Sequence, residues 1–330
     1  MKDTKFSLLT LVLQPCSENP LISLNEWLLE YRSLIAFIPL TFQQGVDKVI
    51  VAINDPRLYP SLLQLIFKQL NTNTVVEWQN RAYRVIGVET DPHTLHIFQI
   101  QVYPQKPLPK TLGRGIHALF FTWLAEADAN LAASIHQSDL IPMSLSIFPD
   151  VVKTRMILKI GLIKPYLLSP LLYGISRHLD NDIILADVPC RLGQGIRILQ
   201  NNNYHSLFQI PSQKTINLRL QSPTSFKQDK FIQPFPLPHL VFENLRKRWN
   251  QFAPEELHYP MIEWEGLTSA FELKTHALKM KGSPEIGSTG WVCYEFSSLE
   301  QAKIATTLAH FGQFAGVGRK VGMGMGQLQL

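Results

Sequence analysis

The most informative stretch of the sequence for the fold is GVGRKVGMGMG, residues 316–326. Its glycines leave one side of the backbone without Cβ atoms, so another backbone or a phosphate can approach closely. Arg319 and Lys320 place two cations in the middle of this opening. Free amide N–H groups and fixed positive charge favour an anion, and a polyanion more than a small one. The glycines expected to border bound phosphates are Gly316, Gly318, Gly322 and Gly324.

This glycine-rich stretch is not a nucleotide-binding fingerprint. Read from Gly316, the pattern G-x-G-x-x-G would need a third glycine at Val321 and a helix after it, but only QLQL, residues 327–330, follows. Residues 299–311 carry apolar side chains at helical spacing. The predicted order is therefore helix, glycine-rich loop and final strand. A loop that is rich in glycine for steric reasons alone stays open as an alternative.

Size and composition indicate a globular protein of two or three domains, since the chain has 330 residues and is 45% hydrophobic. No apolar run approaches the roughly 20 residues that a membrane helix needs, so no membrane association is expected. Cys16, Cys190 and Cys293 are odd in number and far apart, which fits neither a disulfide framework nor a metal site. We expect a reducing, cytoplasmic compartment, with no metal and no cofactor.

The net charge of +5 is unevenly distributed along the chain. Residues 1–90 hold eight basic and eight acidic side chains, so the whole excess lies in 91–330. Residues 211–250 are the most basic part, with only Asp229 and Glu243 as acidic residues. A basic segment of this kind favours nucleic acid as a partner, although a modest net charge can serve solubility alone.

Residues 1–93 are predicted to form an α+β region of their own. Hydrophobic periodicity predicts strands at 6–13, 48–53, 75–78 and 83–88, and helices at 24–37 and 59–70. We find no chemistry in this region, and its electroneutral balance argues against a main RNA-binding role. Docking of a partner or stabilisation of the chain is the default expectation.

The rest of the chain is predicted to repeat the order β-α-β-β-α-β twice, which is the ferredoxin-like order. The first repeat, in a domain at 94–205, has strands at 98–102, 152–160, 182–188 and 195–199, helices at 114–127 and 168–177, and a short helical turn at 131–136. The second, in a domain at 206–330, has strands at 215–221, 268–280 and 290–297 and helices at 239–252 and 299–311. The fold class is α+β, with tandem ferredoxin-like domains after an additional N-terminal α+β region.

Three motifs in the same order carry a family resemblance. They are LAASIH at 131–136 with RGIH ahead of it at 114–117; SPTSFK at 222–227 with RWN at 248–250; and FAGVGRK at 314–320. Over residues 94–330 the chain resembles the CRISPR-associated repeat-processing endoribonucleases, the Cas six family of the RAMP superfamily. The resemblance implies two RAMP/RRM-like domains and precursor CRISPR RNA as the substrate.

Cleavage of RNA needs a base, an acid and charge stabilisation, because the ribose 2′-hydroxyl supplies the nucleophile. Histidine suits both proton transfers, since its pKa lies near neutrality. His136 closes a short helix and matches the catalytic histidine of the family, and His117 stands on nearly the same helix face as Arg114. We expect His136 and His117 to act as acid or base and Arg114 to stabilise phosphate charge. The products would be a 2′,3′-cyclic phosphate and a 5′-hydroxyl, without a metal.

The chain departs from the family pattern at two positions. Some members carry a tyrosine fifteen residues before the histidine and a lysine six after it, where this sequence has Phe121 and Pro142. A Tyr-His-Lys triad therefore cannot be carried over. Either Arg114 and His117 substitute, or turnover is slow, or the protein is a non-catalytic RNA-binding subunit of an effector complex. A scaffold whose residues 1–90 bind a partner is a third hypothesis.

For RNA binding, we expect Arg319 and Lys320 to contact phosphates together with the loop backbone. Lys227, Arg246 and Arg248 would extend this basic track. The expected partners are CRISPR repeat RNA or its precursor transcript, whose product the protein could retain, and other CRISPR effector subunits. Shape recognition of a hairpin and contacts to single strands both fit such a surface.

Overall fold

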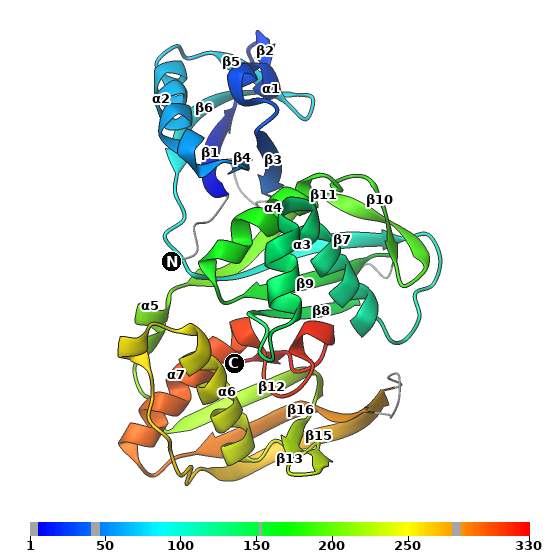
Figure 1. Cartoon of the computed structure of the whole chain (residues 1–330), viewed down its shortest axis with the longest axis vertical. Coiled ribbons are helices and arrows are strands. Elements are labelled where there is room, and N and C mark those ends of the chain that lie inside the picture. Colours follow the sequence, from blue (N-terminus) through cyan, green and yellow to red (C-terminus); the bar gives the residue numbers. More distant parts are fainter. Residues whose placement is uncertain (1–5, 41–46, 152–153, 279–284) are drawn as a thin grey trace.

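The computed structural model describes residues 6–40, 47–151, 154–278 and 285–330. Three units follow one another along the long axis of the molecule, from the N-terminal unit to the C-terminal one (Figure 1). The predicted strands 152–160 and 268–280 extend into residues outside the described ranges at Val152 and Lys279.

The N-terminal unit is itself ferredoxin-like. Its strands pair antiparallel in the order β6-β1-β4-β3, which is the 4-1-3-2 order of that fold. Two short strands, β2 and β5, extend the β6 edge. The elements are β1 Ser7–Pro15, β2 Ile22–Ser23, α1 Leu24–Trp27, η1 Leu29–Tyr31, β3 Ile35–Leu40, β4 Asp47–Ile53, η2 Pro56–Leu58, α2 Tyr59–Leu70, β5 Val75–Trp78 and β6 Arg81–Glu89.

The predicted helix over 24–37 is wrong. Only Leu24–Trp27 is α-helical, and Ile35–Leu40 is strand β3, whose alternating and β-branched side chains suit a pleated sheet. Pro39 lies within this strand. It is tolerated because β3 has a full antiparallel partner only in β4 and meets β11 at the single pair Ile196 and Leu40.

The middle unit has the predicted β-α-β-β-α-β order, with strand order β11-β7-β9-β8. The sequence predicts one strand, at 152–160, where the structure has the two hairpin strands β8 and β9. The elements are β7 Leu95–Pro104, α3 Gly113–His136, β8 Met143–Pro149, β9 Met156–Leu162, η3 Pro165–Leu167, α4 Leu168–Ser176, β10 Asp182–Leu185, β11 Val188–Asn202 and α5 Tyr204–Phe208.

The third unit is also ferredoxin-like, with the order β15-β16-β12-β17. Helices α6 and α7 were both predicted, within a few residues at their ends. The elements are β12 Thr215–Thr224, β13 Phe226–Gln228, β14 Phe231–Gln233, α6 Pro238–Phe252, η4 Glu255–Leu257, β15 Leu267–Leu278, β16 Glu285–Glu295, α7 Leu299–Ala315, η5 Val321–Met323 and β17 Leu328–Gln329.

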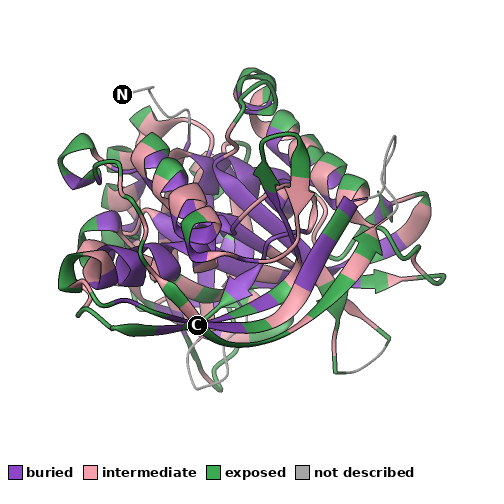
Figure 2. Ribbon diagram, turned by 90° about the horizontal axis from the view of Figure 1, so that it is seen from below, coloured by how far each residue is buried: buried purple, intermediate pink, exposed green. Residues whose placement is uncertain are grey.

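Buried contacts join the three units to one another. Ile38 and Ile50 of the N-terminal sheet share a hydrophobic cluster with Leu172 of α4. The end of α7 lies on the middle sheet, where Ser144 Oγ donates to the Phe314 carbonyl oxygen at 2.7 Å. Figure 2 shows the buried residues gathered inside the molecule, between sheets and helices. Burial of this apolar surface is the main stabilising contribution to the assembly of units.

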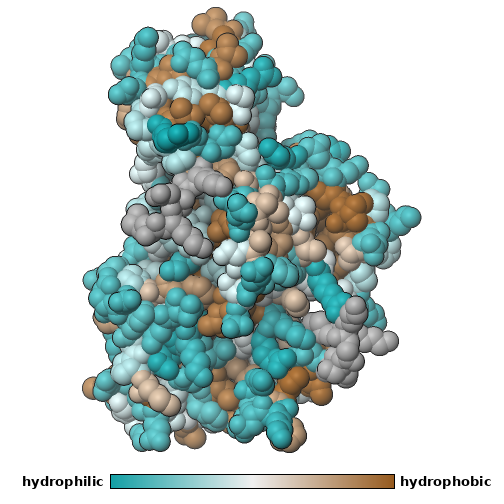
Figure 3. Space-filling model, in the orientation of Figure 1, coloured by the Kyte–Doolittle hydropathy of each residue, from teal (hydrophilic) through white to brown (hydrophobic). Residues whose placement is uncertain are grey.

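The outer surface is mostly hydrophilic in the view of Figure 3, with separate hydrophobic patches on the N-terminal and middle units. No helix in the described part of the chain is long and apolar enough to cross a membrane.

Candidate active site

A kink in helix α3 brings the two predicted histidines together. Asp128 has non-helical backbone angles (φ −147°, ψ 97°), so α3 consists of two helical segments. The Asp128 carboxylate accepts a hydrogen bond from the Leu131 amide at 3.0 Å and so caps the second segment. His117 lies in the first segment and His136 ends the second, and their ring centroids are 5.7 Å apart.

Phe121 contacts both histidines, and the three rings form a triangle. Its ring centroid is 4.8 Å from that of His117 and 4.9 Å from that of His136. At the position where some family members have a tyrosine, this chain therefore has an apolar ring that supports both imidazoles. His136 is exposed and His117 is half-buried, so both rings can be reached from solvent.

The tautomer of His117 follows from its hydrogen bond. Its Nδ1 lies 3.1 Å from the Gly322 carbonyl oxygen. A carbonyl oxygen can only accept, so Nδ1 carries the hydrogen, and Nε2 of the neutral ring keeps a free lone pair. This is the arrangement that a general base requires.

The surroundings of His117 also favour its neutral form. Burial lowers the pKa of His117 below its ordinary value of 6.5, and the nearby His136 lowers it further, while the hydrogen bond to Gly322 opposes the shift. At neutral pH the His117 imidazole is therefore mostly unprotonated and able to take up a proton.

The glycine-rich loop packs against the first turn of α3. A Cβ added at Gly113 would lie 2.3 Å from the Met323 carbonyl oxygen, and one at Gly322 would lie 2.3 Å from Ile141 Cδ1. Glycine at position 113 lets the backbones of α3 and of turn η5 approach closely, and glycine at position 322 leaves room for the Ile141 side chain. The loop thereby places the Gly322 carbonyl next to His117.

Most amide groups of this loop already donate within the protein, so the expectation of free N–H groups is wrong for them. The Gly318 amide donates to Asn244 Oδ1 at 2.8 Å, and the Arg319 amide donates to the Ser225 carbonyl oxygen at 2.9 Å. The amides of Gly316, Val317, Met323, Met325 and Gly326 likewise have backbone acceptors.

The two loop cations share one buried acceptor. Arg319 Nε lies 2.9 Å from Glu285 Oε1, and Lys320 Nζ lies 2.8 Å from Glu285 Oε2. The Glu285 side chain is 2% exposed, whereas those of Arg319 and Lys320 are 32% and 28% exposed. RNA contact by Arg319 and Lys320 therefore stays a prediction, in which the phosphate would share the cations with Glu285.

Of the other three predicted RNA contacts, Arg248 is ruled out by its burial. Its side chain lies in the core and donates to the carbonyl oxygens of Ile141 and Ala315 at 3.1 and 3.0 Å, so it cannot reach RNA in the folded protein. Arg246 forms two hydrogen bonds with Glu243, each at 2.8 Å, and is mostly covered. Lys227 is exposed on β13.

A hollow of about 380 Å³ lies between the start of α3, the end of β12 and the loop. Lys110 and Arg114 line it together with Met323, Gly324 and Met325 of the loop. Within the described residues, the side chains of Lys110 and Arg114 have no hydrogen bond or ion pair. These two cations are therefore available to a phosphate, and Arg114 stands one helical turn before His117.

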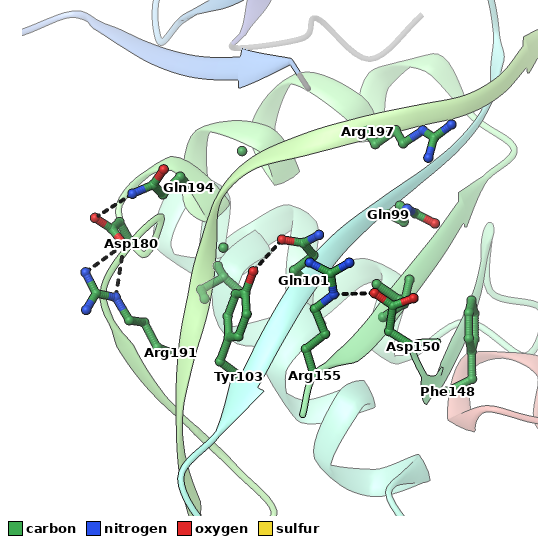
Figure 4. A pocket seen from close by; sticks show the side chains of 14 residues that line it. Gln99, Gln101, Tyr103, Phe148, Asp150, Arg155, Asp180, Arg191, Gln194 and Arg197 are labelled. Atoms are coloured by element: carbon green, nitrogen blue, oxygen red, sulfur yellow. Dashed lines mark hydrogen bonds and ion pairs between the residues drawn. The ribbon is translucent and has the colours of Figure 1, made fainter. Parts of the chain in front are cut away.

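A larger groove of about 780 Å³ lies over β7, β9 and β11 of the middle sheet. In Figure 4, Arg155 pairs with Asp150 and Arg191 with Asp180, whereas no interaction is drawn for Arg197. Glutamines and the partly exposed rings of Tyr103 and Phe148 complete the lining. Cations, amides and aromatic rings on an open sheet are the groups that bind single-stranded nucleic acid.

Sequence reasoning missed three features of the site, namely Gly113, Lys110 and Glu285. Gly113 stands beside the RGIH motif and could have been read as part of it. Lys110 and Glu285 gave no signal, because their roles follow from contacts between segments far apart in sequence. Within the described ranges, no group of three or more His, Cys, Asp or Glu side chains is placed to hold a metal ion.

Comparison with known proteins agrees with the motifs. Residues 218–328 match the family model described as CRISPR-associated endoribonuclease Cas6. The resemblance to Cas6 is confirmed. Cas6 endoribonucleases of Mycobacterium tuberculosis strains CDC 1551 and H37Rv are each 27% identical to this chain over 125 residues, which cover 36% of this chain. The chain spans about 40% of the length of these curated relatives.

Solved Cas6 structures share the fold. The product complex of Cas6 TTHB231 has a TM-score of 0.64 and 22% identity, covering 72% of this chain and 98% of the Cas6 chain. The Thermus thermophilus structure of the same Cas6 gives a TM-score of 0.56 with 21% identity, and the product complex of Cas6 TTHA0078 gives 0.58 with 22% identity. The α+β class with tandem ferredoxin-like domains is thus confirmed. The domain boundaries at 93 and 205 stay a prediction.

Proposed function

We propose that this chain is an endoribonuclease that cuts precursor CRISPR RNA within its repeats without a metal ion. The observation that carries the proposal is the pair of facing imidazoles, of which His117 has a fixed tautomer and a lowered pKa. Two histidines are sufficient to supply the base and the acid of RNA transesterification.

In the proposed reaction, His117 Nε2 takes the proton of the ribose 2′-hydroxyl. The 2′-oxygen attacks the adjacent phosphorus, and the bond from phosphorus to the 5′-oxygen breaks. Protonated His136 gives its proton to the departing 5′-oxygen. The products are a 2′,3′-cyclic phosphate and a 5′-hydroxyl, and each histidine ends in the protonation state with which the other began.

The cations of the hollow would hold the scissile phosphate. Arg114 stands three residues before His117, and Lys110 lines the same hollow. Positive charge placed where the pentacoordinate phosphorus develops additional negative charge stabilises the transition state. Intramolecular attack already has a large proximity advantage, so alignment of the RNA provides much of the rate enhancement. Retention of the product RNA and contacts with other effector subunits are further parts of the proposal.

A second candidate function is RNA binding without cleavage. It is favoured by Phe121 and Pro142, which replace the tyrosine and lysine found in some relatives. Neither side chain can donate a proton or a hydrogen bond to phosphate. Under this alternative the same surfaces bind repeat RNA, and His117 and His136 contribute no chemistry.

The deciding experiment is cleavage of labelled repeat RNA in excess EDTA by the wild type and by His136→Ala. We expect the wild type to cut at one site and to leave a 2′,3′-cyclic phosphate, whereas His136→Ala binds the RNA without cutting it. A wild type that binds but never cuts would establish the second candidate. A wild type that cuts only with added metal would contradict the proposed mechanism.

A further inference from the structure

Glu285 is a buried carboxylate at the first residue of β16, opposite the glycine-rich loop. Its Oε2 accepts a hydrogen bond from Lys320 Nζ at 2.8 Å, and its Oε1 forms an ion pair with Arg319 Nε at 2.9 Å without hydrogen-bond geometry, at an exposure of 2%. A buried carboxylate is costly unless it is paired and hydrogen-bonded. Glu285 and the two cations therefore fix one another in place.

The fixed end of the loop leads directly to His117. Lys320 has a left-handed backbone (φ 54°), and its carbonyl oxygen accepts from the Met323 amide at 2.8 Å and from the Met325 amide at 3.4 Å. These bonds close turn η5 over Val321–Met323. Gly322, in the middle of this turn, supplies the carbonyl oxygen that accepts from His117 Nδ1. Only Val321 separates the anchored lysine from the glycine that orients the imidazole.

We propose that Glu285 is a positioning residue for RNA cleavage, because it anchors the glycine-rich loop through Arg319 and Lys320 and so holds the Gly322 carbonyl against His117. The inference rests on the proposed function of His117. It gives the loop cations a role inside the protein, in addition to any contact with RNA.

Loss of the anchor has a specific consequence for His117. The Gly322 hydrogen bond raises the pKa of His117 against the opposing effects of burial and of His136. When the carbonyl moves away, the pKa of His117 falls further, and Nε2 is no longer the fixed site of the lone pair. The titratable and charged groups beside His117 are His136, from the second segment of α3, and Arg114, one turn before His117 on the same helix. Arg114 can only donate, so it does not replace the missing acceptor.

The test compares Glu285→Gln with Glu295→Gln, a control at the exposed far end of the same strand. The first readout is the titration of the His117 imidazole by NMR in the RNA-free protein. Removal of the Gly322 hydrogen bond is expected to lower the pKa of His117. The second readout is single-turnover cleavage at saturating RNA, where misplacement of the base is expected to cost about 10–100-fold. The affinity of Glu285→Gln for a 2′-deoxy substrate should not fall. The control Glu295→Gln should match the wild type in the titration, in the cleavage rate and in this affinity.

A second variant covers the case in which Glu285→Gln fails to fold. The combination Glu285→Met, Arg319→Met and Lys320→Met replaces the ion group by apolar side chains, an exchange that proteins often tolerate without loss of stability. It should show the same change in the His117 titration. An unchanged titration in the folded variant would overturn the inference. The titration needs no cleavage, so it still tests whether Glu285 holds the Gly322 carbonyl against His117 if the wild type proves inactive, a result that would refute the proposed function and the role in cleavage but not the anchoring.

Discussion

Four basic residues of the third unit differ in their contacts from Lys110, Arg114 and Arg197 of the middle unit. Arg246, Arg248, Arg319 and Lys320 all have protein acceptors, and two of these acceptors are the carboxylates of Glu243 and Glu285. Within the described residues, Lys110, Arg114 and Arg197 have no hydrogen bond or ion pair through their side chains. A basic segment in a sequence therefore shows where charge is concentrated along the chain, whereas only the fold shows which charged side chains are available to RNA.

The largest expected effect concerns the histidine pair. His117→Ala and His136→Ala should each lower single-turnover cleavage by about 10²–10⁴-fold while binding is retained. Because the two residues act as a unit, the double variant should lose little more than the worse single variant. His205→Ala, at an exposed position on α5, is the matched control and should cut at the wild-type rate. Additive losses would show that the two imidazoles act independently.

Arg248 provides the next largest effect, on stability. Arg248→Ala would leave the carbonyl oxygens of Ile141 and Ala315 without their donor in the core. Such unsatisfied buried groups, together with poorer packing, should cost about 3–5 kcal/mol of the free energy of unfolding. Lys247→Ala, on the exposed face of the same helix, should change it by less than about 0.5 kcal/mol. Urea denaturation of both variants is the measurement, and equal stabilities would refute the structural role of Arg248.

The third expectation is a pH dependence of cleavage. Burial, and then the charge of His136, lower the pKa of His117 below 6.5. A general base must be unprotonated, so the rate should rise with pH through the lowered pKa and the acidic limb should have its midpoint below 6.5. The same shift makes the folded state bind fewer protons than the unfolded state, so this contribution to stability decreases as pH falls below 6.5. A midpoint above 6.5 would exclude His117 as the base.

The sequence predicted much of the fold because long amphipathic elements carry strong periodicity. Helices such as 239–252 and 299–311 appear nearly as expected in α6 and α7. The predicted helix at 24–37 is wrong because several short elements follow one another there. Strand Ile35–Leu40 continues the apolar pattern of residues 24–34, so the sequence alone predicts a single helix. That error hid the ferredoxin-like order of the N-terminal unit. The region's role as a partner-docking or stabilising element stays a prediction.

The sequence predicted those residues of the candidate site that lie in recognisable motifs. His117, His136 and Arg114 were chosen from motifs, and the kink at Asp128 brings the two histidines together. The partners of the cations could not be predicted, because Glu285 meets Arg319 and Lys320 only through tertiary pairing. The sequence predicts Arg248 as part of the basic RNA track, whereas the fold gives it two carbonyl acceptors in the core.

The distinction between free and paired cations is best tested by the salt dependence of RNA affinity in two double variants. Removing one cation that binds a phosphate of single-stranded RNA should flatten the slope of log K against log salt concentration by about 0.7. We expect a change of about 1.4 for Lys110→Ala with Arg114→Ala, and a clearly smaller change for Arg319→Ala with Lys320→Ala, whose cations are held by Glu285. The reverse result, with the larger change in the loop variant, would contradict the distinction between free and paired cations.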